Sequence, residues 1–273
     1  MIARRLMLAA PALLLACARR ATAQPITWNG VPAQGGLLRG QAAPGTRMTL
    51  DGRPLRVAPG GEFAMGFSRD HDDSATLAII HPDGRREERR LPVAKRDWDI
   101  QRITGLPGGM VSPDAAALRR ITRERALLAA ARAVDSAGTG FMAEMAWPAR
   151  GRISGIFGSQ RILNGQPRQP HYGLDVAAPT GTPIQAALPG RVSLSGDYFF
   201  FGQVLVVDHG HGVNTLYAHL SERIARDGQM VEKGERIALM GATGRVTGPH
   251  LHFSLSWYQT FLDPQPLLPA QQG

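Results

Sequence analysis

The chain has 273 residues, and its 31 Lys and Arg residues outnumber its 22 Asp and Glu residues, which gives a formal net charge of +9. A length of this order predicts two domains. The arginines are spread over separate segments and no recognised DNA- or RNA-binding motif is present, so the sequence argues against a nucleic-acid partner.

The first residues have the pattern of an export signal. A basic start, Met1 to Arg5, is followed by an apolar run from Leu6 to Ala16 and by the small-residue cleavage site Ala21-Thr22-Ala23. We therefore expect residues 1–23 to be a signal peptide and the protein to be exported to the periplasm or cell envelope. Neither this run nor any later one reaches the roughly 20 apolar residues of a membrane-spanning helix, so no transmembrane span is expected.

Cys17 is the only cysteine in the chain. It ends the run Leu14-Leu15-Ala16-Cys17, which loosely resembles a lipidation motif, but the bulky Leu15 makes a lipid anchor the less favoured alternative. Cleavage after Ala23 removes this thiol, so a metal in the mature chain would be held by His and carboxylate side chains. Cleavage also removes four arginines and leaves a formal charge of about +5, which favours association with an anionic cell envelope.

Residues 24–111 predict an N-terminal β domain. Short β-compatible runs such as Met48–Leu50 and Ala75–Ile80 are broken by turn sequences such as Asp51-Gly52 and Pro82-Asp83-Gly84. A small β-sandwich would suit this pattern. The basic run from Arg85 to Arg90 is interpreted as a charged, exposed edge strand rather than a binding site.

Residues 112–148 predict a helical linker. Ser112 is a suitable N-cap, Pro113 suits the first turn, and the sequence to about Ala137 is rich in Ala, Leu and Arg. One face of the helix is apolar and should pack on a domain. That face comprises Leu118, Ile121 and Leu128. The following residues, Thr139 to Pro148, are expected to form a flexible connection.

Residues 149–273 predict a second β domain. Short strands separated by Gly and Pro turns follow one another from Arg152 to Trp257 without a long amphipathic helix, which indicates an antiparallel sheet. The fold class predicted for the whole chain is therefore mainly β. It consists of a small N-terminal β-sandwich-like domain, a linking helix and a C-terminal antiparallel β domain.

Histidine and aspartate side chains in this second β domain suit a metal. His250 and His252 share one face of a strand because alternate residues point the same way, and His171 and Asp175, four apart in an extended run, share another. Three of those four side chains can converge on one cation. Catalytic zinc uses three protein ligands and accepts imidazole nitrogen and carboxylate oxygen, so a zinc hydrolase is the first hypothesis. Because no HExxH motif is present, unligated imidazoles are the available acid and base groups.

Three ordered motifs carry a family resemblance between about Ser154 and Pro264. An HxGxD motif is followed by a histidine in a Tyr-x-His-Leu context and by a closing HxH, which are His171–Asp175, Tyr217–Leu220 and His250–His252. This ordered set resembles the LytM/lysostaphin-type zinc metallopeptidases, and it is far more specific than a single HxH. The resemblance implies a mostly antiparallel sheet with one Zn²⁺ in a groove across it. It implies that His171, Asp175 and His252 are the zinc ligands, and that His219 and His250 are catalytic.

The same resemblance implies a metalloendopeptidase that hydrolyses the peptide cross-links of bacterial peptidoglycan. Its partners would then be peptidoglycan stems and cross-bridges, together with envelope-associated regulators. Two alternatives are open. One is a non-enzymatic regulator of this fold that activates a cell-wall amidase by binding it, although the intact ligand set argues against this. The other is a secreted protease that acts on Gly-rich proteins, which would share the site and differ in the groove.

The remaining histidines are expected outside the site. His71 and His81 lie in turn-like sequence and are interpreted as surface or hydrogen-bonded residues. His209 and His211 flank Gly210 in a tight hairpin turn; we expect His209 to be structural or to support the site, and His211 to be solvated. The aromatic run from Tyr198 to Phe201 is interpreted as a hairpin, which either lines the groove or packs between strands.

Overall fold

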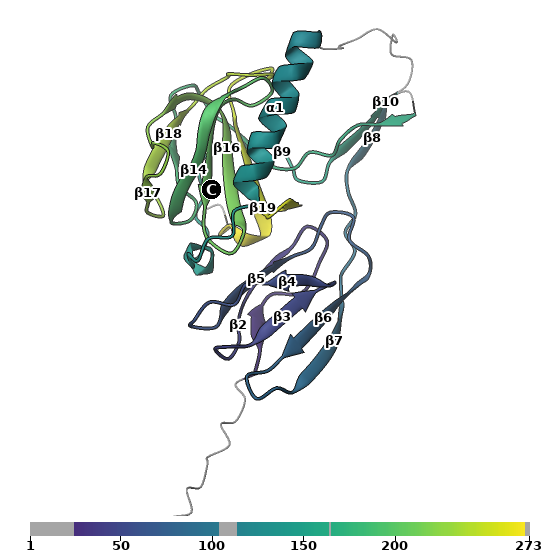
Figure 1. Ribbon diagram of the computed structural model, residues 1–273. Coiled ribbons are helices and arrows are strands. Elements are labelled where there is room, and N and C mark those ends of the chain that lie inside the picture. Colours follow the sequence, from purple (N-terminus) through teal and green to yellow (C-terminus); the bar gives the residue numbers. More distant parts are fainter. Residues whose placement is uncertain (1–24, 104–113, 164, 271–273) are drawn as a thin grey trace, which may run out of the picture.

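The computed structural model describes residues 25–103, 114–163 and 165–270 (Figure 1). These residues form an N-terminal lobe and a C-terminal lobe, each built from β-strands, with the helix α1 (Ala115–Arg132) lying against the C-terminal lobe. The prediction of a mainly β chain with a linking helix is confirmed. The predicted signal peptide, residues 1–23, lies outside the described residues, as do Ser112 and Pro113.

The N-terminal lobe contains two antiparallel sheets within residues 25–103. The first has the order β1-β2-β5 and the second the order β4-β3-β6-β7. Their strands are β1 (Thr27–Asn29), β2 (Leu37–Gln41), β3 (Arg47–Leu50), β4 (Arg53–Leu55), β5 (Glu62–Gly66), β6 (Ser74–Ile80) and β7 (Arg86–Pro92). Alternation sets the buried face, because Ala75, Leu77 and Ile79 of β6 are buried while their neighbours are more exposed.

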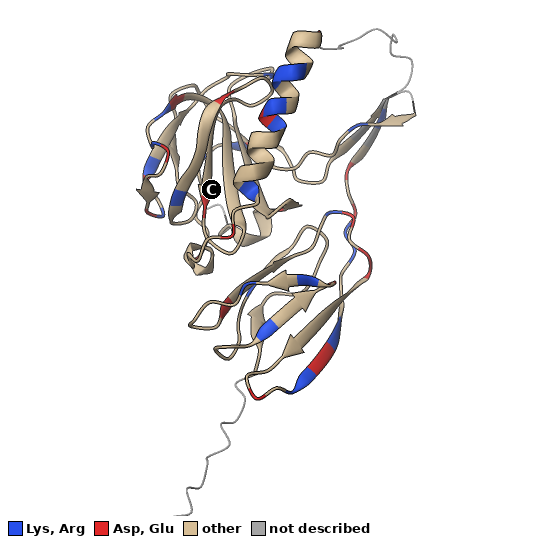
Figure 2. Cartoon of the chain, in the orientation of Figure 1, with Lys and Arg blue, Asp and Glu red and all other residues tan. Residues whose placement is uncertain are grey.

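The basic run in this lobe forms an edge strand, as predicted. β7 pairs with β6 alone in its sheet order, and Figure 2 shows an acidic stretch between two basic stretches along it. Arg89 forms an ion pair with Glu87 at 2.6 Å, and Arg90 donates to the Ser74 hydroxyl at 3.0 Å. Charged side chains on an edge discourage pairing with another chain.

A strand from the end of the N-terminal segment pairs with the C-terminal lobe. β8 (Ile100–Ile103) runs parallel to β10 (Gln160–Leu163), which pairs in turn with β11 (Gln166–Pro167). The predicted N-terminal domain extended to residue 111, but the last strand in the sheets of the N-terminal lobe is β7, which ends at Pro92. The β-strand propensity of residues 100–103 does not indicate which sheet that strand joins.

The C-terminal lobe is built on a twisted antiparallel sheet that contains the order β17-β14-β15-β16-β19-β12-β9. β13 and β18 pair with each other, β18 also pairs with β16, and β20 pairs with β19. The bounds are β9 (Arg152–Gly155), β12 (Leu174–Ala177), β13 (Pro183–Gln185), β14 (Gly190–Tyr198), β15 (Gly202–Asp208), β16 (Val213–Arg223), β17 (Met230–Val231), β18 (Arg236–Met240), β19 (Leu251–Trp257) and β20 (Thr260–Leu262). The predicted antiparallel architecture is confirmed.

Helix α1 covers part of one face of this sheet (Figure 1). Its N-cap is Asp114, whose carboxylate accepts the Ala117 N–H at 2.7 Å, so the helix begins two residues later than a Ser112 cap would place it. It ends at Arg132, before the predicted limit near Ala137. Leu128 packs into a small core on the sheet, but Leu118 is 51% exposed, so the predicted apolar face was wrong at that position.

The two lobes pack into one continuous hydrophobic core. Leu77 of the N-terminal lobe and Phe253 of the C-terminal lobe belong to the same buried cluster. At the contact of β5 with β19 and β20, a Cβ on Gly66 would lie 3.0 Å from atoms of Trp257 and Leu262. Arg96 also bridges the lobes through an ion pair with Asp263 at 2.8 Å.

The segment after α1 lies between these packed surfaces. It contains the short 3-10 helix η1 (Gly140–Met142), and a second one, η2 (Gln265–Leu267), follows β20. Phe141 is fully buried and donates its backbone N–H to His209 O at 3.1 Å. The expectation of a flexible connection from Thr139 to Pro148 was therefore wrong. No helix in the described part of the chain combines the length and the apolar character that crossing a membrane requires.

Candidate metal centre

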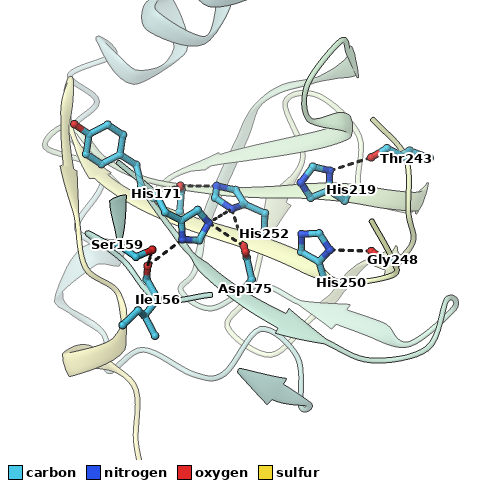
Figure 3. A network of polar contacts seen from close by, with 11 residues as sticks. Ile156, Ser159, His171, Asp175, His219, Thr243, Gly248, His250 and His252 are labelled. Atoms are coloured by element: carbon cyan, nitrogen blue, oxygen red, sulfur yellow. Dashed lines mark hydrogen bonds and ion pairs between the residues drawn. The ribbon is translucent and has the colours of Figure 1, made fainter. Parts of the chain in front are cut away.

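Three side chains of the C-terminal lobe meet at one point (Figure 3). Ligand atoms of His171, Asp175 and His252 all lie within 4.8 Å of one another. The Asp175 Oδ1 atom is 3.1 Å from His171 Nε2 and 2.9 Å from His252 Nδ1, and the two nitrogens are 3.1 Å apart. Zinc bonds of 2.0–2.2 Å in a tetrahedron separate neighbouring ligand atoms by about 3.3 Å. The donor types and their spacing therefore fit one zinc ion with a fourth position for water.

The pairing of β12 with β19 explains why these residues meet. Asp175 on β12 lies directly opposite His252 on β19. His171 precedes β12 and reaches the same point because Gly173 lies between them. A Cβ on Gly173 would come within 2.5 Å of the His252 Cε1 atom, so this position has no room for a side chain. The glycine of the HxGxD motif is thus required by the close approach of the two strands.

In His171 and His252, a hydrogen bond to the ring nitrogen that points away from the centre determines which nitrogen of each ring faces the centre. His171 donates from Nδ1 to the Ile156 carbonyl at 3.0 Å, which leaves a lone pair on Nε2. His252 uses the opposite nitrogen, because its Nε2 lies 3.2 Å from Ser254 Oγ and its Nδ1 faces Asp175. Ser254 in turn donates to the Tyr172 carbonyl, so its oxygen is free to accept from His252. Partners of this kind hold ligand rings in the tautomer that binds a metal.

The electrostatics of the three groups favour an ionised carboxylate. Burial raises the pKa of Asp175, but its close contacts with His171 and His252, whose protonated rings would donate to the carboxylate and carry a positive charge, outweigh it and hold that pKa far below its usual range. Burial lowers the pKa of His252 despite the nearby carboxylate. For His171, burial is the largest single effect and lowers the pKa, but the hydrogen bond to Asp175, the charge of that carboxylate and the bond to the Ile156 carbonyl together outweigh it and the net pKa is raised. One half-buried carboxylate beside two imidazoles is a donor set that suits a divalent cation.

Two further imidazoles lie beside these three side chains. The ring centroids of His219 and His250 are 4.8 Å apart, and that of His219 is 6.1 Å from that of His252. His219 donates from Nδ1 to the Thr243 carbonyl and His250 from Nδ1 to the Gly248 carbonyl, both at 2.9 Å. Each ring therefore keeps its Nε2 lone pair for a proton. Burial lowers the pKa of His219 to about 4, so this imidazole is neutral at neutral pH.

A β-bulge turns His219 toward the site. In a regular strand His219 would share a face with Tyr217, which is fully buried in the core. The register of β16 against β15 shifts between Tyr217 and Leu220, which inserts one extra residue. His219 itself has a φ of +63°, in the left-handed region, and its N–H bonds the Phe201 carbonyl at 2.8 Å. The bulge thus places His219 on the same side as His252.

The remaining histidines lie outside this group. His209 is buried and bonds the Pro189 carbonyl and the Thr215 hydroxyl, each at 2.8 Å, in a structural role. His211 is only 2% exposed and its ring lies 4.8 Å from that of Phe141, so the expectation that it is solvated was wrong. The hairpin turn itself is present, but the segment that follows α1 covers it. His81 bonds Glu87 in the N-terminal lobe.

Sequence reasoning missed the groups that orient the ligands. Ser254 follows His252 by two residues on the same strand, so alternation could have identified it. The Ile156 carbonyl carried no such signal, because a backbone oxygen has no side-chain signature. The aromatic turn between β14 and β15 was anticipated as a hairpin, and its Phe201 ring lies 5.9 Å from the His252 ring.

Comparison with known proteins identifies the family of the chain. The model of peptidase family M23 matches residues 169–264, which include all five residues of the site. A crystal structure of a protein assigned as a peptidase M23 from Pseudomonas aeruginosa is 30% identical, covers 87% of this chain and 95% of its own, and superposes with a TM-score of 0.69. The chain belongs to peptidase family M23.

Curated relatives match a little over a third of this chain. The peptidoglycan DD-endopeptidase ShyA of Vibrio cholerae is 43% identical over 105 residues, which are 38% of this chain and 24% of ShyA. The DD-carboxypeptidase/endopeptidase Mpg of Neisseria meningitidis is 42% identical over 100 residues, which are 37% of this chain and 22% of Mpg. The aligned part thus spans about a quarter of the length of these relatives.

Proposed function

We propose that this protein is an exported zinc metalloendopeptidase that hydrolyses the peptide cross-links of bacterial peptidoglycan in the periplasm or cell envelope. The observation that carries the proposal is the triangle of His171, Asp175 and His252 ligand atoms, with two unligated imidazoles beside it. We assign one zinc ion to these three ligands and the acid and base roles to His219 and His250. The substrate class is supported by the activities named for the curated relatives.

The chemistry divides between the ion and the chain. When bound, zinc polarises water and the scissile carbonyl toward reaction at neutral pH. His250, whose strand neighbour holds the metal, is the proposed general base: its Nε2 accepts the proton of the attacking water while Nδ1 stays bonded to the Gly248 carbonyl. His219 is the proposed partner for the leaving amine. Burial lowers the pKa of His219 to about 4, so its Nε2 carries no proton at neutral pH. The proton that it passes to the departing nitrogen is therefore the one released by the attacking water, and the weak basicity of this imidazole makes that transfer easy.

The intact set of residues favours an enzyme over a regulator. A binding protein that only activates an amidase has no need for three converging ligands and two free imidazole nitrogens. Among cross-links, we favour the direct or D-Ala-containing bridges, which agree with the DD-endopeptidases named among the relatives, over a pentaglycine bridge.

Digestion of purified sacculi tests the proposal. The zinc-loaded protein lacking residues 1–23 should convert dimeric muropeptides to monomers, and a chelator should stop the conversion. His250→Ala should be inactive, whereas the matched control His71→Ala removes a histidine that bonds Asp51 outside the site and should be fully active. Dimers that persist with the folded, zinc-loaded protein would refute the endopeptidase. Stimulation of an added amidase would instead support a regulator, and cleavage of a Gly-rich protein alone would support a secreted protease.

A further inference from the structure

The N-terminal lobe reaches the metal centre through the loop between β5 and β6. Arg69 in this loop is only 6% exposed, and its Nε donates to the Gly158 carbonyl of the C-terminal lobe at 2.9 Å. Its guanidinium also lies over the Trp98 ring, 5.1 Å from the centroid. A buried guanidinium is costly unless its donors are bonded. Nη1 bonds the neighbouring Asp70 carboxylate and Nη2 has no partner among the described residues, so the Nε bond to Gly158 is the one that ties this side chain to the C-terminal lobe.

Gly158 belongs to the segment that holds His171. Residues 156–159, here called the support loop, lie between β9 and β10. The His171 backbone bonds this loop in both directions, because Gly158 N–H donates to His171 O and His171 N–H donates to Ser159 O, each at 2.8 Å. The His171 ring donates to the Ile156 carbonyl of the same loop. The support loop therefore sets both the position and the tautomer of this ligand.

The N-terminal segment packs on the other side of the support loop. Phe157 is 2% exposed, and its ring makes an edge contact with Trp98 at a centroid distance of 5.7 Å. A Cβ on Gly35 would lie 3.0 Å from the Phe157 ring, so Phe157 is inserted between Trp98 and the N-terminal lobe. Gly158 has a φ of +83° and lies so close to the Trp98 ring that a side chain there would overlap it.

We infer that Arg69 is a positioning residue for His171, and that the N-terminal lobe thereby forms part of the metal centre. This inference rests on the proposed zinc site. Without the Arg69 bond the support loop keeps its packing on Trp98 but loses its side-chain hydrogen bond to the N-terminal lobe, so the Ile156 carbonyl holds the His171 ring less firmly in one orientation. Partners behind metal ligands contribute about 10- to 100-fold to metal affinity. Arg69 acts through the loop rather than on the ring, so we expect about tenfold, the lower end of that range.

Zinc affinity of the protein lacking residues 1–23 is the decisive measurement. Arg69→Met keeps the length and apolar packing of the side chain on Trp98 but removes the donor. The matched control is Arg96→Met, because Arg96 also lies over Trp98, at 4.6 Å, and also bridges the lobes, but its bonds go to Gln34 and the buried Asp263. Competition with a chromophoric chelator gives the zinc dissociation constant, and the visible spectrum of the Co²⁺-loaded protein reports the ligand geometry.

The expected result is a zinc dissociation constant about tenfold higher for Arg69→Met, with an altered Co²⁺ spectrum, and wild-type values for Arg96→Met. Arg69→Lys, which keeps a donor on a long side chain, should lie between, and it carries the test if the methionine variant does not fold. Wild-type zinc affinity in a folded Arg69 variant, or equal loss in both methionine variants, would overturn the inference. A wild-type protein that binds no zinc would refute the proposed function itself.

Discussion

His209 makes the stability of the C-terminal lobe sensitive to acid. Its Nδ1–H donates to the Pro189 carbonyl, so its Nε2 accepts from the Thr215 hydroxyl. Thr215 in turn contacts the Tyr217 hydroxyl at 3.2 Å, which accepts the Ala187 N–H at 2.8 Å. Protonation of His209 would put a second donor where the chain needs an acceptor, and would place a charge in a site without solvent.

The size of the effect follows from the pKa difference between the folded and unfolded states. Burial lowers the pKa of His209 to about 4, whereas the unfolded chain titrates near 6.5. Above the unfolded pKa the imidazole is neutral in both states and stability is unaffected. As the pH falls, the unfolded chain takes up the proton first, so the free energy of unfolding decreases. The loss is about 2 kcal/mol by about pH 5 and approaches about 3 kcal/mol below the folded-state pKa.

Urea unfolding followed by tryptophan fluorescence measures this loss. Wild type and His209→Gln are compared at about pH 7.5 and about pH 5, with a chelator present so that metal release does not contribute. The glutamine cannot titrate, so the variant should be less stable at the higher pH but should lose about 2 kcal/mol less between the two. His71→Gln, which removes an imidazole outside this hydrogen-bonded chain, should keep the wild-type acid sensitivity. The same loss in wild type and His209→Gln would refute the reasoning.

Further substitutions test the site and its support. Alanine at any of the three proposed ligands should abolish zinc binding and activity together, whereas His219→Ala or His250→Ala should retain zinc and lose roughly 10²- to 10⁴-fold in turnover. Elemental analysis measures the zinc and a peptide assay the turnover. Loss of zinc from all five variants would contradict this division of roles. Phe157→Ala should lower the free energy of unfolding by about 3–5 kcal/mol in a denaturant titration, and a loss below 1 kcal/mol would argue against its insertion at the interface. Gly173→Ala should weaken zinc binding, because the added methyl group meets the His252 ring; unchanged affinity by chelator competition would contradict that close approach.

Much of the fold and site could be predicted because local rules apply there. Strand alternation placed His250 and His252 on one face, and the ordered motifs indicated which segments come together. Alternation fails at His219, where the bulge in β16 reverses the side on which the residue lies. A bulge is set by the pairing of neighbouring strands, so the sequence of β16 alone does not reveal it.

The predicted exposure was wrong at two residues, His211 and Leu118, where contacts with distant parts of the chain determine the burial. His211 was expected in solvent because it follows Gly210 in a turn, but the segment after α1 packs over that turn and buries the ring. A Cβ on Gly210 would overlap the Gly138 backbone, which shows how closely the two segments meet. Leu118 has the right spacing for the buried face of α1 but lies in the first turn of the helix and is 51% exposed. Distant partners of this kind leave no local trace in the sequence.

The continuous core has a kinetic consequence for the order of folding. The face of the N-terminal lobe around Gly66 is completed by Trp257 and Leu262, which come much later in the chain. Contacts between such distant residues form slowly because a long loop must close first. During synthesis the N-terminal lobe is complete long before its docking surface exists. Its apolar face therefore stays uncovered until β19 and β20 have been made, and these later strands protect it from aggregation.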